Sequence, residues 1–327
     1  MPDLTLSLAM GDYDRTRPIF DGRVKIDGVT PVAMLQSPEE MFFNAFRHQT
    51  CDVSELSLSS YCVSLTRENP PYIAVPVFLS RAFRHSAIYI RSDRGIDGPS
   101  ALRGRRIGIA EYQLTANVWA RRILAEHGVA PTDITWVRGG MDTPGRPEKL
   151  SFVPPQGLVI EPAPEGATLN AMLAEGEIDG FIGPRWPRCF GAGHPHVARL
   201  FPDSQAAEDW YARTRIFPIM HVLGLRRSLA DAHPWLPGAL LKAFSAAKSL
   251  ATAALADTSA SKVTMPFVEE TLLRAQKMGG ALWSYGVAGN EPTLEAFLDA
   301  HFEQGLSPQK LTLEHLFHPA TYEGYAL

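Results

Sequence analysis

The order of hydrophobic and polar positions along the chain predicts strands that alternate with helices. Apolar and polar residues alternate over 4–10, which is typical of a half-buried strand. Apolar residues recur at helical spacing over 115–127 and 168–175, and a glycine ends each of these helices. The other predicted strands lie at 72–77, 134–138, 178–182 and 216–225; residues 51–61 are a short strand that runs into a serine-rich turn, and residues 102–110 are a turn that leads into a buried strand. This pattern indicates an α/β protein with mostly parallel sheets, whose ligands lie outside the carboxyl ends of the strands.

Breaks in this pattern predict two lobes. Residues 91–99 are polar and rich in turn-forming types, so we place a crossover between lobes near them. The first lobe is expected to hold residues 1–95 and the second lobe residues 96–212. The chain then returns to the first lobe over 213–327 and ends in helices. These helices are predicted at 237–255, 266–277 and 291–304.

Composition narrows the class of protein. The 327 residues are 45% hydrophobic and 20% charged, which is enough for two buried cores. The 31 basic and 35 acidic residues give a formal charge of -4 without long runs of one sign, so neither nucleic acid nor a membrane surface is an expected partner. No signal-peptide pattern begins the chain and no window reaches the roughly 18 apolar residues of a membrane span. We therefore expect a cytoplasmic protein with three reduced cysteines.

Cationic side chains stand at the ends of predicted strands. Arg84 and His85 directly precede an apolar segment, and Arg185 follows the strand at 178–182. A guanidinium group binds a carboxylate through two parallel hydrogen bonds, and an imidazole exchanges a proton near neutral pH. Hydroxyls at a helix start, where backbone N–H groups are free, also favour an anion, although simple helix capping explains them equally well. Those hydroxyls belong to Ser57, Ser59 and Ser60.

Five spaced motifs together resemble one enzyme family. They are GDYDR at 11–15, ELSLSSY at 55–61, FRHS at 83–86, EYQ at 111–113 and IFPIMH at 216–221. Over nearly the whole chain they resemble the 4,5-dihydroxyphthalate decarboxylase family. The wider arrangement resembles a type 2 periplasmic-binding-protein-like fold, in which two lobes close over a ligand in the cleft between them. The resemblance implies removal of one carboxylate from 4,5-dihydroxyphthalate, which gives protocatechuate and carbon dioxide.

That reaction defines the roles that the side chains have to fill. Without an electron-sink cofactor, the ring carbon that loses its carboxylate is protonated while the hydroxyl para to it supplies electrons. A histidine suits the proton donor, for which we choose His85 with His221 close behind, because both lie at predicted inter-lobe positions and the sequence alone does not rank them. A carboxylate near the phenols is needed as well, for which Asp14 and Glu111 are the candidates. No cofactor is predicted, and a divalent metal held by cleft residues is left open as an alternative.

Two adjacent carboxylates on the substrate require several cations or hydrogen-bond donors. The predicted substrate-binding residues are Arg15, Ser57, Ser59, Ser60, Arg84, Gln113, Thr115 and Arg185. The binding and catalytic candidates also have structural alternatives. Arg15 could form an ion pair with a neighbouring acid, and Glu111 could cap the following helix. A histidine inside an apolar strand, such as His221, is more often a core residue.

A solute-binding protein that holds an aromatic carboxylate without changing it is the alternative function, because fold alone does not separate a receptor from an enzyme. The absence of an export signal favours the enzyme. We expect a small aromatic carboxylate as the partner, and a homo-oligomer remains possible.

Overall fold

The structure is a computed structural model that describes residues 3–279 and 282–322. Its chain divides into two compact units. Unit 1 comprises Met1–Arg81, Ile219–Glu295 and Thr312–Leu327, and unit 2 comprises Ala82–Pro218 and Ala296–Leu311. The first crossover therefore follows Arg81 instead of lying near residue 95, because the strand that begins at Ile88 joins the sheet of unit 2.

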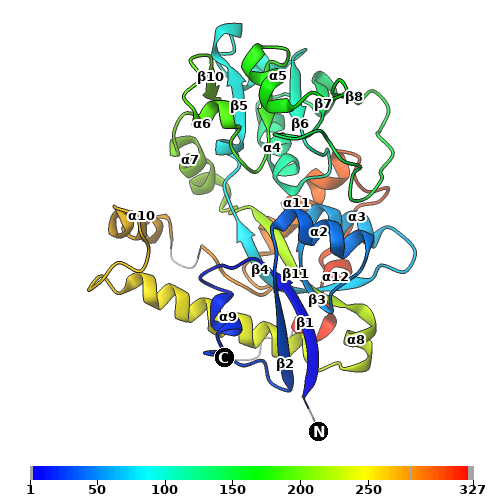
Figure 1. The fold of residues 1–327 in the computed structure, drawn as a ribbon, viewed down its shortest axis with the longest axis vertical. Helices are drawn as coiled ribbons and strands as arrows, with labels where there is room; N and C mark the ends of the chain where they lie inside the picture. The colour runs from blue at the N-terminus through cyan, green and yellow to red at the C-terminus, as the bar shows by residue number, and fades with distance from the viewer. Residues whose placement is uncertain (1–2, 280–281, 323–327) are drawn as a thin grey trace. The chain divides into compact units, whose positions relative to one another are not determined.

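Unit 1 is built on a five-stranded mixed sheet (Figure 1). The strand order is β2-β1-β3-β11-β4, in which β1 runs parallel to β2 and β3 while β11 runs antiparallel to β3 and β4. Strand β11 thus brings the returning chain into the middle of a sheet that is otherwise formed by the first 81 residues. The strands are β1 Leu4–Met10, β2 Val29–Leu35, β3 Val53–Ser57, β4 Tyr72–Arg81 and β11 Ile219–Arg226.

Helices cover this sheet with their apolar residues. In the second helix along the chain, Met41, Phe42, Ala45 and Phe46 are buried, and their spacing is that of one helical face. The helices of unit 1 are α1 Arg17–Phe20, α2 Pro38–Arg47, α3 Leu58–Leu65, α8 Arg227–Ala232, α9 Leu236–Ala256, α10 Val268–Gly279 and α12 Leu313–Leu316. Helix α11 Glu291–Glu303 begins in unit 1 and ends in unit 2.

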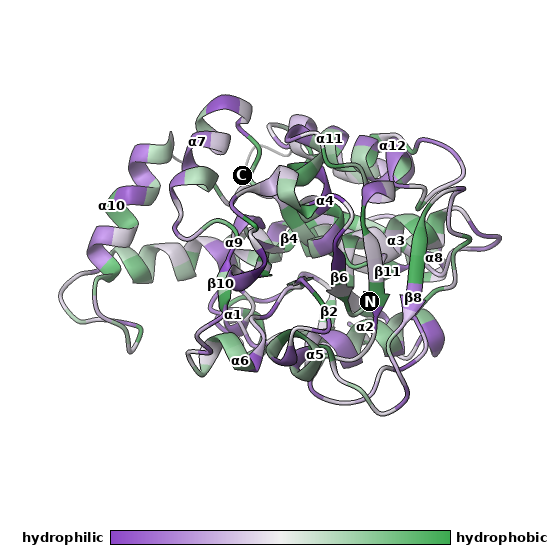
Figure 2. Cartoon of the chain, turned by 90° about the horizontal axis from the view of Figure 1, so that it is seen from above, coloured by the Kyte–Doolittle hydropathy of each residue, from purple (hydrophilic) through white to green (hydrophobic). Residues whose placement is uncertain are grey.

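Two helices of unit 1 expose much of their surface. Helix α9 is the one described helix that is long and apolar enough to cross a membrane, by length and composition alone, and core helices meet the same criterion. It packs against α1 and β4 and buries Leu240 and Phe244 completely. Helix α10 carries both hydrophilic and hydrophobic residues (Figure 2), and none of its own residues is buried.

Unit 2 contains a six-stranded mixed sheet with the order β10-β5-β9-β6-β7-β8. Strands β9, β6, β7 and β8 are parallel, and β5 runs antiparallel to its neighbours β9 and β10. The carboxyl end of β9 therefore lies beside the beginning of β5. The strands are β5 Ile88–Arg91, β6 Arg106–Ile109, β7 Thr135–Arg138, β8 Val159–Pro162, β9 Gly180–Ile182 and β10 Val197–Arg199.

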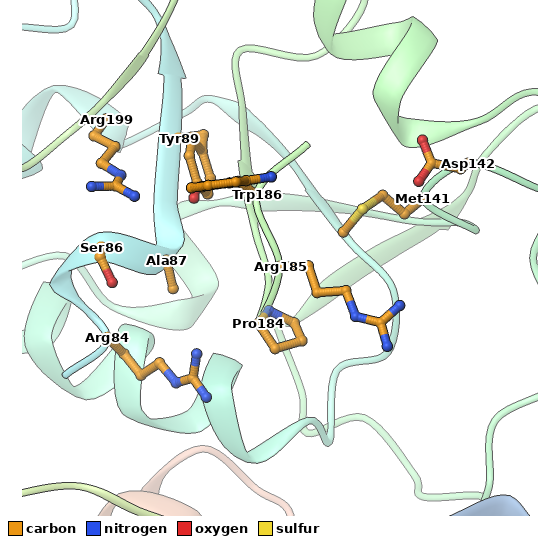
Figure 3. A pocket seen from close by; sticks show the side chains of 10 residues that line it. All are labelled: Arg84, Ser86, Ala87, Tyr89, Met141, Asp142, Pro184, Arg185, Trp186 and Arg199. Carbon is orange, nitrogen blue, oxygen red and sulfur yellow. The ribbon is translucent and has the colours of Figure 1, made fainter. Parts of the chain in front are cut away.

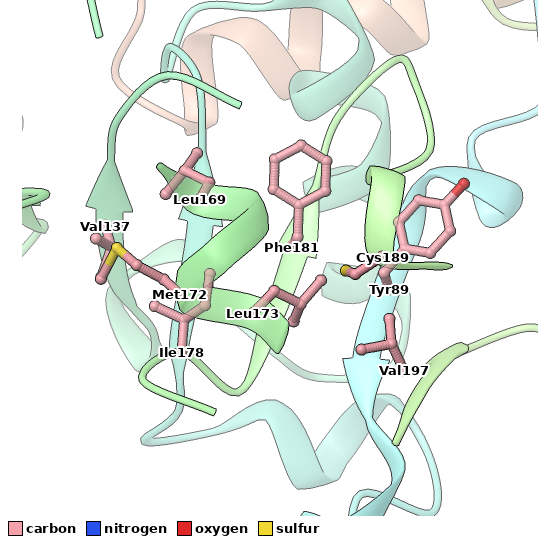
Figure 4. Packing of buried hydrophobic residues seen from close by; sticks show 9 residues of the cluster. All are labelled: Tyr89, Val137, Leu169, Met172, Leu173, Ile178, Phe181, Cys189 and Val197. Carbon is pink, nitrogen blue, oxygen red and sulfur yellow. The ribbon is translucent and has the colours of Figure 1, made fainter. Parts of the chain in front are cut away.

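The helices of unit 2 are α4 Thr115–Glu126, α5 Leu169–Glu175, α6 Arg188–Gly191 and α7 Gln205–Thr214. Apolar side chains from α5, α6 and the strands form one core of this unit, which Figure 4 shows. Thr168 caps α5 through its hydroxyl, and Gly176 ends that helix in the left-handed conformation that glycine adopts at low cost. The core cluster consists of Tyr89, Val137, Leu169, Met172, Leu173, Ile178, Phe181, Cys189 and Val197.

Candidate active site

A buried carboxylate is the centre of the polar residues in unit 1. Glu55 lies in the middle of β3 with none of its surface exposed. Its Oε2 accepts a hydrogen bond of 3.1 Å from the backbone N–H of Gly11, and its Oε1 accepts one of 3.2 Å from the hydroxyl of Tyr13. Burying an ionised carboxylate costs several kcal/mol unless such donors compensate. The turn that carries Gly11 and Tyr13 is therefore held against this side chain.

His221 is the third partner of Glu55. Its Nδ1 lies 2.6 Å from Oε1 of Glu55. The register of β3 and β11 explains this contact, because His221 stands opposite Ser57 and is therefore a diagonal neighbour of Glu55 on the same face. The ring of Phe42 meets the imidazole edge to face at 4.8 Å. The side chain of His221 is 17% exposed, so the pair combines a buried carboxylate with an imidazole that is partly open to solvent.

A carboxylate that is hydrogen-bonded to Nδ1 of a histidine determines which nitrogen of the ring can react. When Nδ1–H donates to Glu55, the imidazole is held in one orientation and Nε2 is left to give or take a proton. Carboxylate–histidine pairs of this kind are used for general acid–base chemistry. The arrangement therefore makes His221 competent for proton transfer, with Glu55 as the residue that positions it.

The turn after β1 carries Gly11, Tyr13 and Arg15. Gly11 is required here, because an added Cβ would lie only 2.2 Å from the ring of Tyr13. Burial raises the pKa of the Tyr13 hydroxyl, and the charge of Glu55 raises it further, so this phenol is a hydrogen-bond donor at neutral pH. Arg15 donates from Nε to the carbonyl of Leu79 at 2.7 Å, and its guanidinium lies 4.2 Å from the centre of the Tyr13 ring. These contacts account for the position of Arg15 without a ligand.

The remaining predicted residues of unit 1 divide into buried and exposed groups. Ser57, Ser59 and Ser60 are all buried at the start of α3, and the side chain of the N-cap residue Ser57 makes no capping hydrogen bond. The hydroxyl of Ser60 has no hydrogen-bond partner within the described parts of the chain. Asp14 is half exposed and pairs with Arg15 at 3.1 Å. This ion pair is the structural alternative that the sequence allowed for Arg15.

Unit 2 holds a cationic pocket of about 390 Å³ (Figure 3), a size within the range of small-molecule sites. Arg84 and Arg185, both predicted to bind substrate, line it together with Arg199, which the sequence did not single out. Burial lowers the pKa of Arg84 to about 10, so this guanidinium is still charged at pH 7. The other lining residues are Ser86, Ala87, Tyr89, Met141, Asp142, Pro184 and Trp186.

His85 occupies a different environment from that of Arg84. It is 3% exposed and does not line the pocket. Its ring packs against Phe201 and Trp210 at centroid distances of 5.1 and 5.5 Å, and its Nδ1 lacks a hydrogen-bond partner among the residues described. Burial lowers the pKa of His85 to about 4, so the ring is neutral at pH 7. This is the setting of a core histidine, and it favours His221 as the proton-transfer group.

Glu111, the other predicted carboxylate, is part of a buried ion pair. Its Oε2 lies 2.5 Å from Nζ of Lys149, and the two side chains are 8% and 2% exposed. Gln113 is completely buried and donates to the carbonyl of Leu150, and Thr115 is buried as the first residue of α4. These contacts attach the segment around residue 150 to the end of β6. They give Glu111 and Gln113 a structural role.

Sequence reasoning missed Glu55 and Arg199, and only Glu55 carries a local signal. Glu55 is a charged residue in a segment predicted to contain a strand, where an unpaired charge is costly, whereas Arg199 lies outside every predicted strand. Their partners are far away in sequence, since Glu55 meets His221 through β11 and Arg199 stands opposite Tyr89 through β10. No group of three or more His, Cys, Asp or Glu side chains in the described residues could hold a metal ion.

The fold defines the class of protein. The structure matches the alkanesulfonate-binding protein SsuA from Xanthomonas axonopodis pv. citri with a TM-score of 0.56 at 13% identity, covering 98% of both chains. It also matches the desulfurization enzyme DSZB with a TM-score of 0.52 at 16% identity, covering 97% of this chain and 96% of the other. The chain therefore has a periplasmic-binding-protein-like fold, a fold found in an enzyme as well as in binding proteins.

Sequence similarity identifies the family within that class. The chain is 56% identical over 330 aligned residues to 4,5-dihydroxyphthalate decarboxylase of Comamonas testosteroni, covering 100% of both. It is 58% identical over 213 residues to the Pseudomonas putida protein of the same name, covering 64% of this chain and 83% of the other. No family model matches the chain. The chain belongs to the 4,5-dihydroxyphthalate decarboxylase family, and the family predicted from the five motifs is confirmed.

Proposed function

We propose that this chain is a carboxy-lyase that converts 4,5-dihydroxyphthalate to protocatechuate and carbon dioxide. The choice of reaction rests on the 56% identity to the Comamonas testosteroni decarboxylase over the entire chain. The residues can supply the chemistry that this reaction needs, namely a positioned proton donor and cations for two carboxylates. No cofactor is part of the proposal.

The reaction consumes one proton for each carbon dioxide released. The hydroxyl para to the departing carboxylate gives its proton to water, which later returns one, and electron density moves through the ring to the carbon that bears the carboxylate. That carbon then takes a proton, the bond to the carboxylate breaks, and its electron pair restores the aromatic ring as the phenol regains a proton. We assign the carbon protonation to Nε2 of His221, because Glu55 occupies Nδ1 at 2.6 Å.

The two units have separate roles in this proposal. Proton transfer belongs to the Glu55–His221 pair of unit 1, and recognition of the carboxylates belongs to the arginine pocket of unit 2. Tyr13 and the N–H of Gly11 hold the carboxylate that orients the imidazole. Loss of a group in unit 1 is then expected to reduce turnover, whereas loss of an arginine in unit 2 is expected to weaken binding.

Incubating the purified chain with 4,5-dihydroxyphthalate tests the function directly. We expect equal amounts of carbon dioxide and protocatechuate, with the same rate before and after treatment with a chelator. Binding of the compound without release of carbon dioxide would contradict the proposal and would indicate a solute-binding protein. Loss of the reaction on chelation, restored by a divalent metal, would contradict the metal-independent mechanism.

A further inference from the structure

The pocket of unit 2 combines positive charge with an exposed aromatic ring. Arg84, Arg185 and Arg199 line it, and Figure 3 shows the indole of Trp186 among these side chains. Trp186 is 61% exposed, so its ring is open to a ligand. An indole face beside guanidinium groups suits a ligand that is both flat and anionic.

The charge of the lining is strongly positive. Three guanidinium groups face one carboxylate, that of Asp142, and Arg188 lies 3.7 Å from Asp142. The Nε of Arg199 is buried and has no hydrogen-bond partner in the part of the chain that the structure describes. A buried donor of this kind costs free energy until an acceptor reaches it. The pocket therefore favours a ligand with more than one negative charge.

Sheet topology brings these residues together from three segments. Arg185 and Trp186 follow the carboxyl end of β9, and Arg84 precedes β5, whose first residue pairs with the last residue of β9. Arg199 ends β10 and stands opposite Tyr89 of β5. Each residue thus lies at or close to one edge of the sheet, at the carboxyl ends of β9 and β10, which is where α/β sheets bind ligands.

We propose that this pocket recognises an aromatic ring with two adjacent carboxylates, and that Arg199 and Trp186 determine that specificity. The guanidinium groups pair with the carboxylates, and the indole stacks on the ring. The assignment of this ligand to the reaction rests on the proposed function. Because decarboxylation removes one of the two carboxylates, the product loses an ion pair in this pocket and leaves more readily than the substrate.

Titration calorimetry with unreactive probes tests the proposal on the full chain. Phthalate has both carboxylates but lacks the para hydroxyl that the reaction needs, benzoate has one carboxylate, and cis-cyclohexane-1,2-dicarboxylate lacks the aromatic face. We expect phthalate to bind wild-type protein more than about tenfold more tightly than benzoate, since a second charge pair is made. Equal affinity for phthalate and benzoate in the wild-type protein would overturn the proposal.

Two variants separate the contribution of the Arg199 charge from that of the Trp186 ring to phthalate binding. Arg199→Met is expected to weaken phthalate binding on the order of 30-fold and to remove most of the preference over benzoate. Trp186→Leu is expected to weaken phthalate binding roughly 3- to 10-fold while leaving the cyclohexane analogue unaffected. Arg213→Met and Trp235→Leu are matched controls, because both residues are exposed and neither lines the pocket. Wild-type affinity for phthalate in both pocket variants would also overturn the proposal.

The binding measurements test the pocket independently of the proposed reaction. If phthalate binds as described but 4,5-dihydroxyphthalate is not decarboxylated, the pocket is supported and the reaction is wrong. If Arg199→Met decarboxylates 4,5-dihydroxyphthalate with the wild-type KM and kcat, the pocket is wrong and the reaction is supported.

Discussion

Replacing His221 with Asn is expected to lower kcat for 4,5-dihydroxyphthalate by about 10²- to 10⁴-fold, the usual contribution of a positioned proton donor. Asn keeps a polar side chain next to Glu55 but has no group that gives or takes a proton at neutral pH. The binding of substrate is expected to change little, because the arginines of unit 2 are untouched. Stopped-flow measurement of carbon dioxide release, together with calorimetry using phthalate, separates the two quantities.

His85→Asn is the comparison that decides between the two histidines that the sequence left unranked. His85 packs against Phe201 and Trp210, so its loss is expected to lower the free energy of unfolding while kcat falls much less than in His221→Asn. A large loss of kcat in His85→Asn with wild-type turnover in His221→Asn would reverse our assignment of the proton donor.

Replacing Lys149 with Met is expected to lower the free energy of unfolding by about 3–5 kcal/mol, because Glu111 is left as a buried charge without its partner. The two side chains are 2% and 8% exposed, so water reaches neither charge well. Urea unfolding followed by circular dichroism at pH 7 measures the loss. The expected effect is one of the largest that a single substitution can have in this chain.

The double variant Lys149→Met with Glu111→Gln is the control for this effect. Removing both charges is expected to restore most of the stability, since replacing a whole buried ion pair is often nearly neutral. We also expect this double variant to keep its decarboxylase activity. A fully stable double variant with no activity would show that Glu111 has the chemical role first predicted for it, and that the ion pair is not its main function.

Local sequence patterns predicted the elements that depend on local interactions. The strand at Leu4–Met10 and the helices Thr115–Glu126 and Leu169–Glu175 begin and end close to the predicted positions, because periodicity and terminal glycines act over a few residues. Pairing between distant strands was harder to predict. The expected mostly parallel sheets are mixed, since β11 enters the sheet of unit 1 and β5 that of unit 2 in the antiparallel direction.

The candidate site also divides into residues that local patterns could select and residues that meet only through pairing between distant strands. Arg84 and Arg185 were selected as strand-end cations, and the structure brings them into one pocket. Arg199 joins that pocket only because β10 pairs with β5, and Glu55 meets His221 across 166 residues of sequence. Contacts of this kind follow from strand order, which hydrophobic patterning does not specify. A charged residue within a predicted strand is the local signal that could have selected Glu55, whereas no strand was predicted around Arg199.

The central claim is that Glu55 acts through His221 in protonating the ring carbon. Single-turnover rates of wild type, Glu55→Gln, His221→Asn and the double variant test it most directly, because residues that act as a unit lose activity non-additively. We predict that Glu55→Gln is strongly impaired and that the double variant is about as slow as His221→Asn alone. Losses that multiply in the double variant would contradict the claim, since they would mean that the two side chains act independently.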